Sequence, residues 1–294
     1  AGMQPFVPWF KREVEPEYPR VTTCQKCLRQ DDLENVGVTA RHLSFFEMLG
    51  NFSFGDYFKQ EAIEWAWEFI TQGFGIDPER LWISVHTTDD EAAEIWQKRV
   101  GVPKERIVRL EDSWWGLGMP NTPCGPCTEL YVDMGPEYGQ GEPGGDNDRY
   151  FEIWNVVFQM YNDDGAGGRT LLPKPGIDTG MGLERAGILL QGVNNPFELD
   201  VFKPLITRLA ALAEVDELYG NKETSTATRV IAEHARASTF LINDGVMPSN
   251  EGRGYLLRRL IRRAYRFGRA LGLQEPFLHK LAPAVVEGMK GGYP

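Results

Sequence analysis

The chain of 294 residues lacks any long apolar stretch. Its apolar runs are short and interrupted by charged residues, whereas a membrane-spanning helix needs about 20 consecutive apolar residues. It also lacks a recognisable signal or transit peptide and any internal repeat. We therefore expect a cytoplasmic globular protein with no membrane partner. Because 42% of the residues are hydrophobic, the chain can bury a large core, which we expect to be divided between two domains.

Cysteine is scarce, and the four present form two pairs, Cys24/Cys27 and Cys124/Cys127. A doubled Cys-x-x-Cys is typical of a zinc site. These pairs lie far apart in the sequence, however, and the second is part of Pro-Cys-Gly-Pro-Cys, a segment suited to special backbone geometry. We favour reduced cysteines and expect no zinc; a structural zinc site and a redox dithiol remain as alternatives.

Positive charge is in deficit over most of the chain, which carries a net charge of −11. Such a balance argues against a nucleic-acid partner, because phosphate repels an acidic surface. The distribution reverses this inference. Residues 253–294 contain seven arginines and two lysines against two glutamates, a net charge of +7, so the remainder carries −18. The C-terminal region is therefore the candidate for binding phosphate.

The expected elements fall into two blocks, first strands with helices and then helices alone. Strand patterns occur at 21–29, 42–49, 81–86, 106–110, 129–133 and 151–161. Helical spacing of apolar residues occurs at 57–71, 90–100, 183–191, 200–212, 225–243, 254–271 and 278–290. Stretches rich in glycine and proline, at 116–127 and 135–148, are expected to be loops. This order favours an α+β sheet domain over residues 1–195, followed by a helical domain over 196–294.

Three segments carry side chains suited to binding a nucleotide and an amino acid. The first joins two expected strands and places Arg29 and His42 at its mouth, where they can bind phosphates. The second, strand 151–157, has alternate side chains that can line a pocket. The third, 178–185, reads Asp-Thr-Gly-Met-Gly-Leu-Glu-Arg: the carboxylate can hold an ammonium group, and the guanidinium can stack on a purine. An ordinary turn leading into a helix remains an alternative for this third segment.

These segments resemble motifs 2 and 3 of the class II aminoacyl-tRNA synthetases. Three longer strings, 39–58, 125–129 and 245–255, closely resemble the alanyl-tRNA synthetase family. The resemblance runs along the whole chain and implies an alanine-tRNA ligase that uses ATP and Mg²⁺. It implies a class II synthetase-like antiparallel sheet flanked by helices, followed by a helical domain that recognises the acceptor stem of tRNA(Ala).

The chain also departs from this family. Motif 1, the end of the helical region, the editing domain and the oligomerisation domain are missing from the sequence given, which begins Ala-Gly-Met. We therefore expect a catalytic fragment, a processed form or a shortened relative.

For ATP, the resemblance implies that Arg29 contacts the α-phosphate and stabilises charge as pyrophosphate leaves. His42 would contact the distal phosphates, Asp31 would belong to the same site, and Phe46 and Arg185 would enclose the adenine. An alternative for Phe46 is a core position. Because neighbouring strand residues face opposite ways, either Phe46 or the residue before it must lie in the core.

For alanine, the resemblance implies that Asp178 holds the ammonium group and that Asn155 and Trp115 close the pocket. Gly180 would leave room for backbone contact. Val157 shares a strand face with Asn155 and can contact the substrate methyl group.

Glu152, on the same expected strand, is a candidate Mg²⁺ ligand. Strand alternation places it on the opposite face from Asn155 unless a β-bulge intervenes. A surface or structural carboxylate is the alternative.

The expected helix 254–271 is the candidate surface for tRNA. It carries five arginines beside an apolar stripe: Arg258, Arg259, Arg262, Arg263 and Arg266. We favour phosphate contact over a merely solvated face, because no acidic residue interrupts these arginines. The resemblance also assigns Arg253 to this surface and Asn250 to the base edges of the acceptor-stem minor groove.

Two other functions remain open. The chain could form alanyl-adenylate and pass alanine to a carrier protein or small amine, although the arginine-rich helix argues against this. It could instead be a non-catalytic RNA-binding module, although Arg29, Asp178 and Arg185 argue against that.

Overall fold

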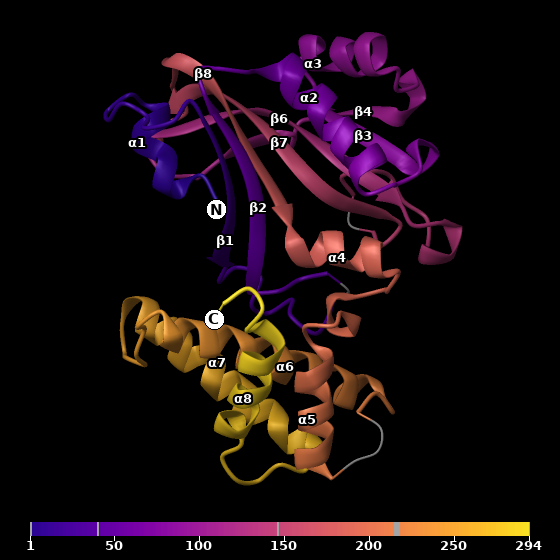
Figure 1. Ribbon diagram of the computed structural model, residues 1–294, viewed down its shortest axis with the longest axis vertical. Coiled ribbons are helices and arrows are strands. Elements are labelled where there is room, and N and C mark those ends of the chain that lie inside the picture. Colours follow the sequence, from indigo (N-terminus) through magenta and orange to yellow (C-terminus); the bar gives the residue numbers. More distant parts are fainter. Residues whose placement is uncertain (1, 40, 146, 215–217, 294) are drawn as a thin grey trace. The chain divides into compact units, whose positions relative to one another are not determined.

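A computed structural model describes residues 2–39, 41–145, 147–214 and 218–293 (Figure 1). The chain forms two compact units. The first unit comprises Ala1–Gln25 and Glu47–Leu183, and the second comprises Lys26–Phe46 and Glu184–Pro294. The limits of these units differ from the boundary at 195/196 that the sequence predicts between two domains. That boundary stays a prediction about functional domains. The segment Lys26–Phe46 departs most from a simple division along the sequence, because it joins the later helices.

Within the described residues, eight strands form one sheet in the order β1-β2-β8-β7-β6-β3-β4, with β5 paired to β6. Their bounds are β1 Arg20–Leu28, β2 Phe45–Phe54, β3 Leu81–His86, β4 Ile107–Leu110, β5 Trp114–Gly116, β6 Thr122–Asp133, β7 Tyr150–Asp163 and β8 Arg169–Gly182. The predicted α+β architecture with an antiparallel sheet is confirmed, except that β3 and β4 are parallel.

The expectation of a loop over 116–127 is wrong for its C-terminal half, where β6 begins at Thr122. Gly125 serves the sheet here. A Cβ atom on this residue would lie 1.8 Å from the carbonyl oxygen of Phe158, so only glycine permits the close approach of the strands. The sequence pattern also missed β8, which contains Pro173 and Pro175. Proline and glycine mark turns in most sequences, and only the pairing of β8 with its neighbours shows that they lie in a strand here.

The helices follow the predicted order. Their bounds are α1 Val7–Phe10, α2 Lys59–Glu68, α3 Asp90–Glu94, α4 Leu183–Gln191, α5 Lys203–Ala213, α6 Lys222–Asn243, α7 Gly252–Gly268 and α8 Leu278–Met289. The expected helices at 57–71 and 90–100 each end in a wider π-helical turn, Phe69–Gly73 and Ile95–Val100. In the second unit, α5 to α8 pack together as a bundle (Figure 1).

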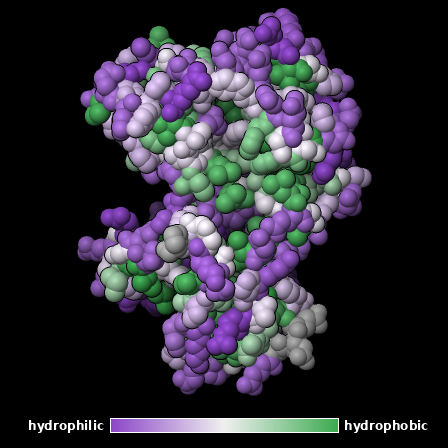
Figure 2. Space-filling model, viewed as in Figure 1, coloured by the Kyte–Doolittle hydropathy of each residue, from purple (hydrophilic) through white to green (hydrophobic). Residues whose placement is uncertain are grey.

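Polar and charged residues cover most of the face drawn in Figure 2, with apolar patches between them. Among the helices in the described part of the chain, none is both long and apolar enough to cross a membrane.

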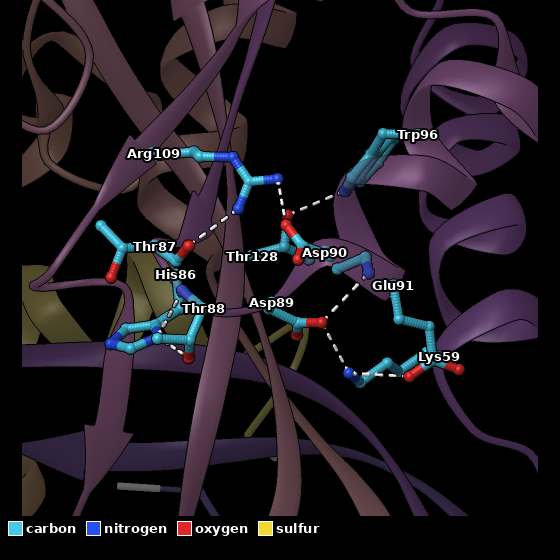
Figure 3. Close-up of polar contacts among 11 residues, drawn as sticks. Lys59, His86, Thr87, Thr88, Asp89, Asp90, Glu91, Trp96, Arg109 and Thr128 are labelled. Atoms are coloured by element: carbon cyan, nitrogen blue, oxygen red, sulfur yellow. Dashed lines mark hydrogen bonds and ion pairs between the residues drawn. The ribbon is translucent and has the colours of Figure 1, made fainter.

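Buried polar contacts fasten the first-unit helices in place (Figure 3). Lys59, the first residue of α2, lies 2.7 Å from the carboxylate of Asp89, and both side chains are almost fully buried. Asp89 also caps α3 by accepting a hydrogen bond from the backbone N–H of Ala92. The indole of Trp96 donates to the hydroxyl of Thr128 on β6, at 2.9 Å. The first two contacts join the starts of α2 and α3. The third attaches the π-helical turn that follows α3 to the sheet.

Replacing Lys59 with methionine is expected to lower the free energy of unfolding by about 3 kcal/mol or more, because Asp89 would remain buried without its cation. Chemical denaturation measures this loss. Arg109→Gln is the matched control, since Arg109 and Asp90 form an ion pair that is largely exposed. Removing that pair should cost less than about 1 kcal/mol. Equal losses of unfolding free energy in the two variants would contradict a stabilising role for the buried Lys59–Asp89 pair.

Candidate functional site

One face of β6, β7 and β8 collects the residues predicted to bind alanine. Val157 pairs with Asp178, and Asn155 pairs with Gly180. Residues directly opposite each other in an antiparallel pair project from the same face of the sheet. The four residues therefore share one face; strand alternation in the sequence predicted this for Asn155 and Val157, and the pairing with β8 adds Asp178 and Gly180.

Asp178 is the carboxylate that β8 contributes to this face. Its side chain is buried, and its described side-chain partner is Gln159, whose amide lies 3.4 Å away. Burial raises the pKa of Asp178 from 3.8 to about 7, outweighing the hydrogen bond from Gln159. A carboxylate held in this way is stabilised by any cation that approaches it.

Glu129, which the sequence analysis did not select as a site residue, orients Asn155. Its Oε1 accepts a hydrogen bond from the Asn155 amide at 3.0 Å, and its Oε2 accepts from Ser84 at 3.0 Å and from Tyr131 at 2.5 Å. Burial, and then the charge of Glu129, raise the pKa of Tyr131, so this phenol stays protonated and donates. Glu129 ends the string 125–129 that carried the family resemblance, which was the available signal.

Trp115 and Gly180 shape the surroundings of this face. Trp115 lies on β5 opposite Gly125 and packs against a buried cluster of Met3, Phe10, Phe52 and Phe54. A Cβ atom on Gly180 would approach the sulfur of Met48 to 3.2 Å, so the glycine keeps this part of the face open. Contact of either residue with alanine stays a prediction.

A β-bulge places Glu152 on the same face as Asn155. Leu130 pairs with Trp154, but Tyr131 pairs with Glu152, so one extra residue of β7 is inserted between these pairs. Glu129, which pairs with Asn155, and Tyr131 lie two residues apart on β6 and therefore face the same way. The bulge thus brings Glu152 to the Asn155 face, and its role as a magnesium ligand stays a prediction.

The described residues hold no cluster of three or more His, Cys, Asp or Glu side chains that could bind a metal ion by themselves. A Mg²⁺ ion carried by phosphates needs only one or two protein carboxylates, which Glu152 can supply.

The predicted nucleotide-binding residues belong to the second unit. The guanidinium of Arg29 lies 5.1 Å from the centre of the Phe46 ring. Phe45 is the core member of the aromatic pair: it is buried and stacks on Phe240, whereas Phe46 is partly exposed. His42 lies 2.6 Å from the hydroxyl of Thr39.

Two further candidates for ATP lie in the same unit. Asp31 is exposed in the turn after β1, and Arg185 is partly exposed on α4. The structure therefore places the ATP candidates in the second unit and the alanine candidates in the first.

The arginines of α7 do not all share one exposed face. Arg258, Arg259, Arg262 and Arg266 are exposed, as is Arg253 at the start of the helix. Arg263 is 8% exposed and donates to Nε2 of His234 at 2.9 Å. Burial lowers its pKa. The expectation that Arg263 lies with the others is therefore corrected: this position falls at the edge of the apolar stripe, and its side chain turns inward.

Four of these exposed arginines, Arg258, Arg259, Arg262 and Arg266, line a groove of about 1090 Å³ in the second unit. Asn250 lies in the same groove, where its side-chain oxygen accepts a hydrogen bond from Arg258. Arg259 is paired with Glu34 at 2.6 Å. A groove with this density of guanidinium groups attracts a polyanion.

The four cysteines lie on β1 and β6 of the sheet, and none of them forms a disulfide bond in the described residues. Cys27, Cys124 and Cys127 are buried, and burial raises the pKa of each thiol. Protonated thiols bind zinc poorly. We therefore expect metal analysis of the purified protein to find well under one zinc per chain. Stoichiometric zinc that is lost when Cys24 or Cys124 is changed to serine would contradict this prediction.

Residues 1–294 match the family described as tRNA synthetases class II (A). The chain belongs to this family. It is 54% identical over 301 residues to an alanine–tRNA ligase of Desulforamulus reducens, and that match covers 100% of this chain and 34% of the relative. A ligase of the same name from Fusobacterium nucleatum is 52% identical, also over 100% of this chain and 34% of the relative. The chain thus spans about a third of the length of these relatives.

Among solved structures, an apo histidyl-tRNA synthetase of S. aureus matches with a TM-score of 0.37 and 16% identity, over 62% of this chain and 48% of that chain. Membership of the class II family agrees with the observed architecture, an antiparallel sheet flanked by helices.

Proposed function

We propose that the chain activates alanine with ATP to form alanyl-adenylate and transfers the alanyl group to the 3′ end of tRNA(Ala). The observation that carries this proposal is Asp178, a buried carboxylate whose pKa is raised to about 7, beside Gly180 and Asn155 on one sheet face. A buried negative charge of this kind binds the ammonium group of a small amino acid. The names of the relatives, alanine–tRNA ligase, support alanine as that amino acid.

The chemistry needs no protein nucleophile. A carboxylate oxygen of alanine attacks the α-phosphorus of ATP. A bond forms between this oxygen and the phosphorus as the bond from the phosphorus to pyrophosphate breaks. Arg29 stabilises the charge on the α-phosphate and His42 binds the distal phosphates, while Asp31 belongs to the same segment. Phe46 and Arg185 stack on the adenine. Glu152 would hold Mg²⁺ together with the phosphates, and the bound ion would supply neutralising charge for pyrophosphate.

The substrate-specific contacts to alanine come from the first unit. Asp178 binds the ammonium group, Asn155 and Trp115 close the pocket, and Val157 contacts the methyl group. Glu129 holds the Asn155 amide in place through the 3.0 Å hydrogen bond. Gly180 leaves space for the ligand next to the backbone.

The arginine-lined groove of α7 takes the acceptor stem. Arg258, Arg259, Arg262 and Arg266 of this groove contact phosphates together with Arg253 at the start of α7, and Asn250 contacts base edges. The five arginines are exposed residues of the basic C-terminal region 253–294, which carries +7 within a chain of net charge −11. We place this activity in the cytoplasm.

Exchange of labelled pyrophosphate into ATP tests the activation step, with glycine and serine as competing substrates. We expect exchange to depend on alanine, because a pocket fitted to one methyl group discriminates by size. Absence of alanine-dependent exchange would refute the proposal and favour a non-catalytic RNA-binding module. Exchange without aminoacylation of tRNA(Ala) would favour an enzyme with a different acceptor.

A further inference from the structure

A buried polar network on α6 is not used by any role described so far. Glu233 and His234 are 1% and 0% exposed. Oε1 of Glu233 accepts three hydrogen bonds, from the backbone N–H of Ser44 at 2.8 Å, the hydroxyl of Ser44 at 2.7 Å and the backbone N–H of Phe45 at 2.8 Å. Its Oε2 accepts a further bond from Nδ1 of His234. One side chain of α6 thus fixes the backbone of the segment that enters β2.

Glu233 acts on this segment as a charged group. Burial by itself would raise the pKa of Glu233, but the hydrogen bonds from His234, Ser44 and Phe45 outweigh it, and the pKa is lowered. Hydrogen bonds to a carboxylate are about twice as strong as those between neutral groups. The carbonyl of Ser44 also accepts the backbone N–H of Arg29 at 2.8 Å. Glu233 therefore sets the backbone beside both Arg29 and Phe46, two residues proposed to bind ATP.

Arg236, three residues further along α6, holds the other proposed wall of the nucleotide site. Its side chain is 2% exposed and lies 2.5 Å from the carboxylate of Glu184. Glu184 immediately precedes Arg185, which is proposed to stack on the adenine. The Arg236 guanidinium also lies 5.0 Å from the centre of the Phe45 ring. A single helix thus positions the residues on both sides of the base.

His234 extends this network to α7. Its Nδ1 bonds to the Glu233 carboxylate, and its Nε2 faces the Arg263 guanidinium at 2.9 Å. A guanidinium can only donate, so Nε2 must accept and the proton must be on Nδ1. The imidazole therefore bridges Arg263 and Glu233 through one hydrogen bond to each. Arg263 follows directly after Arg262, an exposed arginine of the groove proposed to bind RNA.

We propose that Glu233 and Arg236 are positioning residues for the nucleotide site, and that His234 couples this site to α7, so that RNA on α7 tightens ATP binding. The inference rests on the proposed function. RNA bound along α7 contacts the helix that carries Arg263, and Arg263 is bonded through His234 to Glu233, so RNA and ATP act on one hydrogen-bonded network. Because coupling between two ligands is reciprocal, ATP tightens RNA binding by the same factor.

Glu233→Gln tests the positioning role. The variant keeps the size of the side chain but removes its charge, so we expect the KM for ATP in pyrophosphate exchange to rise about tenfold. The KM for alanine should stay within about twofold, because the hydrogen bonds described for Asn155 and Asp178 are with Glu129 and Gln159. Thr228→Val, which removes a buried hydroxyl elsewhere on α6, is the control and should change neither value. Equal rises for both substrates, or no rise for ATP, would overturn this role.

Two substitutions of His234 test the coupling. The amide nitrogen of asparagine imitates Nδ1, so His234→Asn keeps the hydrogen bond to Glu233 and loses the hydrogen bond from Arg263. The amide of glutamine reaches the position of Nε2, so His234→Gln keeps the hydrogen bond from Arg263 and loses the hydrogen bond to Glu233. The Kd of a non-hydrolysable ATP analogue is measured with and without a short RNA hairpin that carries the acceptor stem of tRNA(Ala).

In the unmodified chain, the hairpin should lower this Kd at least about fivefold. Without the hairpin, His234→Asn should have the same Kd for the analogue as the unmodified chain, but the hairpin should no longer lower it. His234→Gln should have a raised Kd for the analogue even without the hairpin. No RNA effect in the unmodified chain, or an unchanged effect in His234→Asn, would overturn the coupling. If alanine-dependent exchange is present and these variants behave as the unmodified chain does, the inference fails and the proposed function stands. If exchange is absent from the start, the proposed function itself fails.

Discussion

Replacing Asp178 with asparagine is expected to raise the KM for alanine by about 100-fold to 1000-fold, while the KM for ATP changes by less than about threefold. Asparagine keeps the shape of the side chain but leaves the ammonium group without a counter-charge in a pocket where Asp178 is only 5% exposed. Steady-state pyrophosphate exchange with each substrate varied in turn measures both constants. A parallel rise of the two KM values would contradict the role of Asp178.

The same residue should give alanine binding a characteristic pH dependence. Burial raises the pKa of Asp178 to about 7, so below that pH the free protein carries a neutral group where a carboxylate is required. We expect kcat/KM for alanine to fall by about tenfold for each pH unit below 7. In Asp178→Asn, this dependence should disappear. A flat profile in the unmodified protein would show that the carboxylate is already ionised.

Stability should change in the opposite direction to binding. The unfolded chain releases the Asp178 proton near pH 3.8, whereas the folded chain holds it until about pH 7. The stability associated with this group is therefore complete below pH 3.8 and is lost as the pH rises through 7. At pH 8, Asp178→Asn should be more stable than the unmodified protein, by on the order of 3 kcal/mol. A less stable variant would mean that loss of alanine binding reflects damage to the fold.

Changing Arg258, Arg262 and Arg266 to glutamine should reduce aminoacylation far more than alanine activation. Adenylate formation uses only ATP, alanine and Mg²⁺, so exchange should stay within a factor of about three. Each lost phosphate contact should reduce the slope of log K against log salt for tRNA by about 0.7 to 0.9, so the triple variant should bind with a visibly flatter salt dependence. Filter binding over a range of salt concentrations measures the slope.

A charge-matched control separates these contacts from general electrostatics. Arg99, Arg106 and Arg109 form exposed or partly exposed ion pairs in the first unit. Their replacement by glutamine removes the same total charge away from α7 and should leave the tRNA salt slope unchanged. An equal loss of slope in both triple variants, or normal aminoacylation in the α7 variant, would indicate that the α7 arginines form only a solvated face.

The sequence by itself determined the family, the order of most elements and the residue types of both proposed sites. Strand β3 and helix α4 have the bounds that their patterns predicted, Leu81–His86 and Leu183–Gln191. These elements are short-range features, in which hydrophobic periodicity follows directly from the chain. The common face of Asn155 and Val157 also follows from strand alternation.

Tertiary structure decided the remaining features, because they depend on contacts between residues that are distant in the sequence. The bulge opposite Tyr131 turns Glu152 to the Asn155 face, and a bulge exists only in relation to the neighbouring strand. The two prolines of β8 indicate a turn until its partner strands are known. Burial raises the pKa of Asp178, and burial is a property of the packed chain. Arg263 carries the same side chain as its exposed neighbours, but its contact with His234, 29 residues away, withdraws it from the surface.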